Sequence, residues 1–123
     1  MTGIAPWLSV RNATEALAFY RAAFGAIDLE RHVDDAGEVQ VAQLWIGGAD
    51  FWIAHDPGSS PDAHEGAPVR MILSVDEPDI TFERAVAAGA TEIALVHEEH
   101  GWRIGRIADP FGHHWEIGRR LEA

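Results

Sequence analysis

The residues best placed for chemistry lie near the C-terminus, on a strand that leaves a tight turn. Residues 109–112 read Asp-Pro-Phe-Gly, the residue types typical of a type I turn. Alternate side chains of a strand point to opposite faces, so His114 and Glu116 should share one face, with Trp115 and Ile117 on the other. A carboxylate beside an imidazole could transfer protons or ligate a metal, whereas a lone glutamate on a strand is usually only solvated.

Three tryptophans and one arginine are predicted to point the same way as Glu116. Strand alternation places Trp7, Trp45, Trp52 and Arg70 opposite the uniformly apolar positions of their strands. Tryptophans combined with a few convergent polar groups are typical of a small-molecule pocket, although the rings could instead pack against the other half of the chain or a second subunit. Arg70 and Glu116 could form a structural ion pair or grip a polar group of a ligand.

An internal repeat predicts the elements that position these residues. Leu-Ser-Val at 8–10 returns at 73–75, a shift of 65, and Gly-Ala at 25–26 returns at 89–90, a shift of 64. The order of predicted strands and helices repeats as well. We therefore expect a single domain of two βαβββ units, residues 1–56 and 69–123, joined by a linker of chain breakers at 57–68.

The fold class expected from this pattern is α+β, a cupped mixed sheet with two helices on its outer face. Asn12 and Gly25 are expected to cap a helix at 13–24, and Gly89 a second helix at 79–88. Strands are expected at residues 4–10, 27–33, 39–46, 50–55, 69–75, 91–97, 102–108 and 113–118.

Composition limits the possible partners. The 123 residues include 20 acidic and nine basic side chains, for a formal net charge of −11. This charge argues against nucleic acid and would favour a cationic ligand. The chain has no cysteine, which excludes disulfides and thiolate metal sites, and no apolar run long enough for a membrane span. No secretory signal is visible, so we expect a cytoplasmic protein.

The repeated units, the Phe-Tyr-Arg-Ala-Ala-Phe-Gly helix end at 19–25 and the Asp-Pro-Phe-Gly-His-His-Trp-Glu stretch at 109–116 resemble the vicinal oxygen chelate superfamily. That superfamily contains glyoxalase I, extradiol dioxygenases, fosfomycin-resistance enzymes and bleomycin-resistance proteins. The Trp-Arg pair at 102–103 and the Asp-Pro-Phe-Gly-His stretch at 109–113 are most similar to its small PhnB-like branch. Arg103 is also a candidate ligand-binding residue. The resemblance implies the fold and leaves the substrate open.

In metal-using members, four strand positions related by the repeat supply His, Glu or Gln ligands to one divalent ion. The resemblance carries these positions to Ala5, Trp52, Arg70 and Glu116, of which only Glu116 has a usable donor. We therefore expect no metal cofactor. The alternative is one divalent metal on His114 and Glu116, with His32, His55, His97 or His100 completing the set of ligands.

Two functions of different class remain. The first is metal-independent binding of a small molecule, aromatic or cationic, with drugs and antibiotics among the candidates, in a cavity lined by tryptophans. The second is a lyase, isomerase or dioxygenase of the same superfamily, with Glu116 as general base or acid, Arg70 stabilising an oxyanion and His114 relaying a proton. A homodimer is expected in either case, and a dimer without any ligand is a third possibility.

Overall fold

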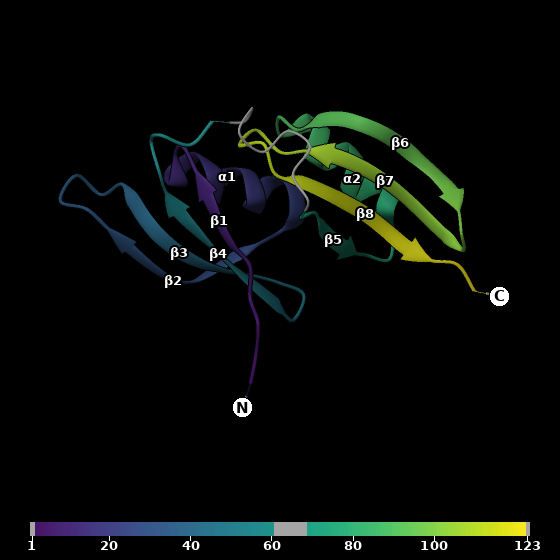
Figure 1. Ribbon diagram of the computed structural model, residues 1–123, viewed down its shortest axis with the longest axis horizontal. Coiled ribbons are helices and arrows are strands. Elements are labelled where there is room, and N and C mark those ends of the chain that lie inside the picture. The colour runs from purple at the N-terminus through teal and green to yellow at the C-terminus, as the bar shows by residue number, and fades with distance from the viewer. Residues whose placement is uncertain (1, 61–68, 123) are drawn as a thin grey trace. The chain divides into compact units, whose positions relative to one another are not determined.

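The computed structural model describes residues 2–60 and 69–122. The chain divides into two compact units at Ser60 and Pro61, a point inside the predicted linker 57–68. Residues 61–68 of that linker lie outside the described residues. Each unit contains one four-stranded sheet and one helix (Figure 1), and each is described by itself below.

The first unit is a mixed sheet with a helix packed on one face. Its elements are β1 (Trp7–Val10), α1 (Ala13–Phe24), β2 (Ile27–Val33), β3 (Val39–Ile46) and β4 (Ala49–His55). The strand order is β1-β4-β3-β2, in which β1 pairs with β4 in parallel and the other pairs are antiparallel. Helix α1 packs on β3 and β4.

Helix α1 begins and ends at the residues that the sequence predicts. The Asn12 side chain accepts a 3.0 Å hydrogen bond from the backbone N–H of Glu15, and Gly25 closes the helix in the left-handed region at φ 69°. The first helical N–H, that of Ala13, donates to Nδ1 of His55 over 3.1 Å. Tyr20, fully buried, meets the ring of Phe51 edge to face at 5.3 Å between centroids. These contacts fix one face of the sheet against the helix.

The second unit repeats the pattern. Its elements are β5 (Met71–Ser74), α2 (Pro78–Ala87), β6 (Thr91–Glu99), β7 (Trp102–Ala108) and β8 (His114–Arg120), in the sheet order β5-β8-β7-β6. Strand β5 pairs with β8 in parallel. Gly105 lets α2 approach β7, since a Cβ added there would lie only 2.9 Å from the ring of Phe82 and the side chain of Val96.

The predicted α+β fold of two βαβββ units is confirmed, with one four-stranded mixed sheet in each unit. The first strand begins at Trp7 instead of residue 4, and the last runs on to Arg120 instead of stopping at 118. Pro6 lacks an N–H, although its carbonyl accepts a 2.8 Å bond from Trp52.

The predicted division of side chains between the two faces of each sheet is also observed. Positions expected on the helix side include fully buried side chains in both units, as at Leu44, Ile53 and Ile117, each 0% exposed. The opposite face of each sheet, here called the open face, carries no helix from the described residues of its own unit. Residues expected on the open faces are half-buried or exposed.

Candidate functional site

The open face of the first unit carries the three predicted tryptophans. Strand register places Trp7 beside Trp52, and Trp52 beside Gln43, while Trp45 stands next to Asp50. The Trp7 and Trp52 rings are stacked, with centroids 6.2 Å apart and planes 24° apart. Trp7 is 59% exposed and Trp45 39% exposed. Large apolar surface is therefore displayed together with polar groups.

The charged strand positions of this face include two carboxylates, Glu30 and Asp50, next to the polar side chains of Gln43 and His32. Gln43 donates a 2.9 Å hydrogen bond to Asp50, and Glu30 lies 3.1 Å from a ring nitrogen of His32. Register places Glu30 beside Gln43, so both carboxylates belong to the open face. No arginine occupies a strand position of this face, since Arg31 pairs with Ala42 on the helix side. The first unit thus offers aromatic rings bordered by negative charge.

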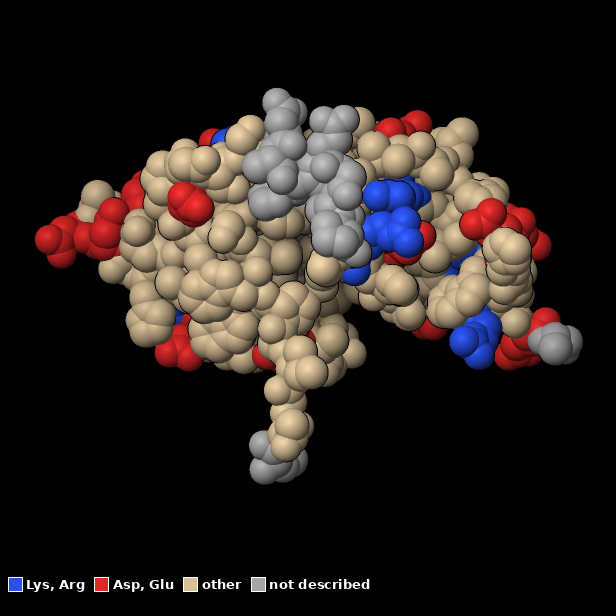
Figure 2. Space-filling view, in the orientation of Figure 1, with Lys and Arg blue, Asp and Glu red and all other residues tan. Residues whose placement is uncertain are grey.

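The open face of the second unit has a different chemistry. Ile72, Glu116 and Arg106 form one row across β5, β8 and β7. Arg70 Nε lies 3.6 Å from the Glu116 carboxylate, too long for a hydrogen bond but close enough for an ion pair. Arg106 Nε instead donates a 3.0 Å hydrogen bond to Nδ1 of His114. Basic and acidic side chains accordingly lie next to one another on the visible surface of this unit (Figure 2).

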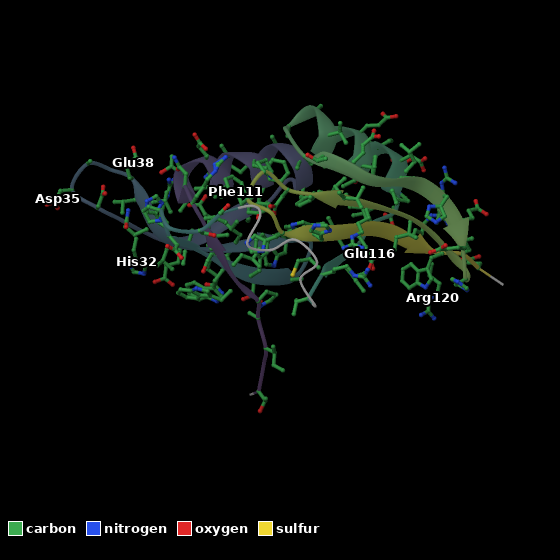
Figure 3. All side chains as sticks on the ribbon, turned by 45° about the horizontal axis from the view of Figure 1, so that its top comes forward. His32, Asp35, Glu38, Phe111, Glu116 and Arg120 are labelled. Carbon is green, nitrogen blue, oxygen red and sulfur yellow. The ribbon has the colours of Figure 1, made fainter. Side chains whose placement is uncertain are left out.

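A hollow of about 220 Å³ opens on the same face. Its lining combines apolar side chains with charged ones, namely Ile72, Glu99, His100, Trp102, Ile104 and Glu116. The β6–β7 turn supplies one wall, with His100 at φ 49° and Gly101 at φ 81°, the left-handed pair typical of a tight hairpin. Gly118 leaves room for the Ile104 side chain of this lining, because a Cβ there would lie 2.8 Å from it. Figure 3 labels Glu116 on β8.

A buried carboxylate holds the hairpin that presents Glu116. Asp109 is 4% exposed, and its Oδ1 accepts hydrogen bonds from the backbone N–H groups of Phe111 and His113 at 3.0 and 2.9 Å. Its Oδ2 accepts from the indole N–H of Trp115 at 2.9 Å. The 3.0 Å bond from the Gly112 N–H to the Asp109 carbonyl closes the predicted turn. These bonds hold Trp115, the first buried residue of β8, in place relative to the turn.

Arg103, one of the candidate ligand-binding residues, does not share the open face. It forms a two-pronged ion pair with Asp79 of α2, at 2.8 and 2.6 Å, on the helix side of β7. The hydrogen bond from Arg103 lowers the pKa of Asp79 and raises the pKa of Arg103. Arg103 therefore ties α2 to the sheet, while Trp7, Trp45 and Trp52 lie in one unit and Arg70, His114 and Glu116 in the other.

The donor chemistry of these residues does not suit a divalent metal. Glu116 is paired with Arg70, and Nδ1 of His114 accepts a hydrogen bond from a guanidinium, so both candidate ligands face cations. Nδ1 of His97 lies 2.8 Å from the Leu95 carbonyl, and Nε2 lies 3.2 Å from the Glu99 carboxylate. Both contacts raise the pKa of His97. Within residues 2–60 and 69–122, no three histidine, aspartate or glutamate side chains converge on a point that could hold a metal.

Two features of the second unit are not among the sequence predictions. Arg106 is one of them, although counting back from the 109–112 turn pairs it with Glu116 across the hairpin. Asp109 was predicted only as a turn residue, and nothing in the sequence distinguishes its buried carboxylate from an ordinary turn aspartate.

Comparison with known proteins places this geometry in a family. The profile of the Glyoxalase/Bleomycin resistance protein/Dioxygenase superfamily matches residues 4–117, and the chain belongs to that superfamily. An uncharacterised protein from Mycobacterium bovis is 36% identical over 124 residues, covering 94% of this chain and 82% of the relative. No helix in the described parts of the chain is long and apolar enough to cross a membrane.

Solved structures share the fold. TioX from Micromonospora sp. ML1 is 25% identical with a TM-score of 0.78, covering 98% of this chain and 100% of its own. A bleomycin-binding protein complexed with bleomycin matches at 19% identity and a TM-score of 0.68, covering 98% and 99%. A PhnB protein from Bacillus cereus matches at 14% identity and a TM-score of 0.70, covering 98% and 100%.

Proposed function

We propose that the protein binds a small, flat molecule without a metal and releases it unchanged. The observation that carries the proposal is the stacked pair Trp7 and Trp52, displayed on an open sheet face next to Trp45. An exposed group of aromatic side chains bordered by a few polar atoms is typical of a ligand-binding surface. Each ring that a ligand covers contributes on the order of 1 kcal/mol of stacking beyond the buried area.

Two further observations support the proposal. The donor set around Glu116 faces arginines, so a metal-dependent reaction lacks its ligands among the described residues. A protein of the same fold was crystallised with bleomycin, which makes bleomycin and other aromatic drugs the first compounds to test here. Glu30 and Asp50 border the tryptophans and would favour a ligand with a positive charge.

The test is tryptophan fluorescence during titration with bleomycin and a panel of flat aromatic cations. We expect saturable quenching in the wild type and a Kd about tenfold weaker for Trp52→Ala. Ile80→Ala is the control, because Ile80 is 48% exposed on α2 and belongs to neither open face. EDTA should leave the titration unchanged. Stoichiometric metal in the purified protein, with binding lost on chelation, would overturn the proposal.

An enzyme is the second candidate, and one observation favours it. Glu116 is 24% exposed at the rim of the hollow and is paired with Arg70, an arrangement that could abstract a proton beside a stabilised oxyanion. Turnover distinguishes this candidate from a binding protein. An enzyme of this kind would convert its ligand and lose that rate in Glu116→Gln, whereas a binding protein would return the ligand unchanged.

We also propose a homodimer. Exposed apolar side chains of the edge strand β2 of the first unit include Ile27, Leu29 and Val33, each at least 50% exposed. A surface of this kind on an isolated chain is costly in water, and a second copy would cover it. Light scattering at micromolar concentration should give twice the mass of one chain, and a monomer mass would count against this proposal.

A further inference from the structure

The second unit contains one half-buried arginine, Arg106, whose charge no carboxylate among the described residues balances. Of the nine arginines, all within the described residues, only Arg103 and Arg106 are half-buried and the others are exposed. Arg103 is paired with Asp79 and Glu98. Arg106 has no carboxylate within 4.0 Å in the part of the chain that the structure describes, although Glu116 is its register partner on β8.

Arg106 is held by a neutral partner instead. Its Nε donates to Nδ1 of His114 over 3.0 Å, which requires that Nδ1 be unprotonated and places the ring proton on Nε2. The bond fixes the plane of the guanidinium and uses only one of its five donors. The two terminal nitrogens therefore keep the fork geometry that matches a planar oxyanion.

Glu116 and Arg70 lie 3.6 Å apart and balance each other, which leaves the charge of Arg106 in this row. Glu99, the other carboxylate that lines the hollow, lies 3.2 Å from Nε2 of His97. Next to this cluster, Ile72 and Ile104 line the hollow of about 220 Å³ on the same face. Ile104 lies two residues before Arg106 on β7, so both side chains point to the open face.

We propose that Arg106, oriented by His114, is a recognition site for the carboxylate of a small monoanionic ligand whose apolar body fills the hollow beside it. A half-buried guanidinium without a carboxylate costs free energy, and a ligand carboxylate would offset that cost through two parallel hydrogen bonds. The hollow is smaller than the roughly 300–1,000 Å³ of pockets for drug-sized molecules, which favours a ligand of about one aromatic ring. This inference rests on the proposed ligand-binding function and assigns a second type of chemistry to it.

The probes are benzoate, its neutral analogue benzamide and the cation benzylamine, titrated into the full chain and followed by NMR shifts. About 0.1 M salt screens the net charge of −11 beyond about 10 Å and leaves direct contacts with Arg106 in place. We expect benzoate to bind at least about tenfold more tightly than benzamide, or about 1.4 kcal/mol, with shifts around Arg106 and Ile104.

Three variants test the assignment. Arg106→Gln should reduce benzoate binding to the level of benzamide, and Arg106→Lys, which keeps the charge but not the fork, should weaken it about threefold to tenfold. Arg84→Gln makes the same change on an exposed helix position and should have no effect. Glu116→Gln should tighten benzoate binding about threefold, because it removes a repelling charge and releases Arg70. A structural role for Arg106 would not produce this opposite response at Glu116.

Each outcome decides the inference. Equal binding of benzoate and benzamide would overturn the carboxylate site while leaving the proposed ligand-binding function intact. The carboxylate site is also overturned if benzylamine binds most tightly, if Arg106→Gln binds benzoate as well as Arg84→Gln does, or if benzoate causes no shifts at about 20 mM. Failure of the tryptophan titration in the first unit would overturn the proposed function alone, since Arg106 lies in the second unit.

Discussion

Replacing Asp109 should destabilise the protein more than replacing any surface carboxylate would. Its two carboxylate oxygens accept three hydrogen bonds, from Phe111, His113 and the indole of Trp115, at 2.9–3.0 Å. A hydrogen bond to a charged group is worth about 1.5–3 kcal/mol, and a buried donor without an acceptor costs about 1–3 kcal/mol. Asp109→Ala removes both acceptor oxygens, leaves these three donors without them, and should lower the free energy of unfolding by about 3–5 kcal/mol.

The isosteric change Asp109→Asn separates the contributions. Asparagine can keep one oxygen on the two backbone N–H groups, but its amide then turns a donor toward the indole N–H of Trp115. We expect a loss of about 2–3 kcal/mol from this substitution. In a Trp115→Phe background, which lacks the indole donor, the same substitution should cost about 1–2 kcal/mol less, so the double-mutant cycle isolates the contact.

The assay is urea unfolding followed by far-UV circular dichroism, at one protein concentration, with the slope of the transition compared across variants. Asp35→Asn is the matched control, because Asp35 is an exposed turn residue, and it should change stability by less than about 0.5 kcal/mol. The reasoning fails if Asp109→Asn is as mild as the control, or if Trp115→Phe leaves its cost unchanged.

Further predictions concern packing at Gly118, the loss of stability at low pH, and the N-terminus of α1. Gly118→Ala should destabilise by about 1–3 kcal/mol and weaken ligand binding in the hollow by displacing Ile104, measured by circular dichroism and calorimetry. The hydrogen bond from Arg21 lowers the pKa of Asp28 in the folded protein below its value in the unfolded chain. The ionised Asp28 therefore stabilises the fold at any pH above its unfolded-state pKa, and this stabilisation is lost as the pH falls through the folded-state pKa. Arg21→Gln should therefore flatten the acid limb of a stability profile. His55→Ala removes the acceptor at the start of α1 and should cost about 1 kcal/mol in urea unfolding.

The sequence predicts most of the fold because local signals agree with the internal repeat. Asn12 and Gly25 mark the ends of α1, and period-two alternation correctly sorts Leu44 and Trp45 onto opposite faces. The open face was harder to predict. The partners of Arg103 and Arg106 depend on which side of β7 each residue occupies, and the neutral partner of Arg106 follows from side-chain geometry that no spacing rule encodes.

Strand β8 lies between β5 and β7, so the last strand in the chain occupies the middle of its sheet. In the described sheet, β5 pairs with β8 alone, and about 40 residues separate the end of β5 from the start of β8. Strand β5 can therefore pair only after those residues have been synthesised. This long-range parallel pairing predicts that the second unit folds late and cooperatively, after the local pairing of β6 with β7. During synthesis, the sheet core and the face bearing Glu116 should therefore form in the same kinetic step.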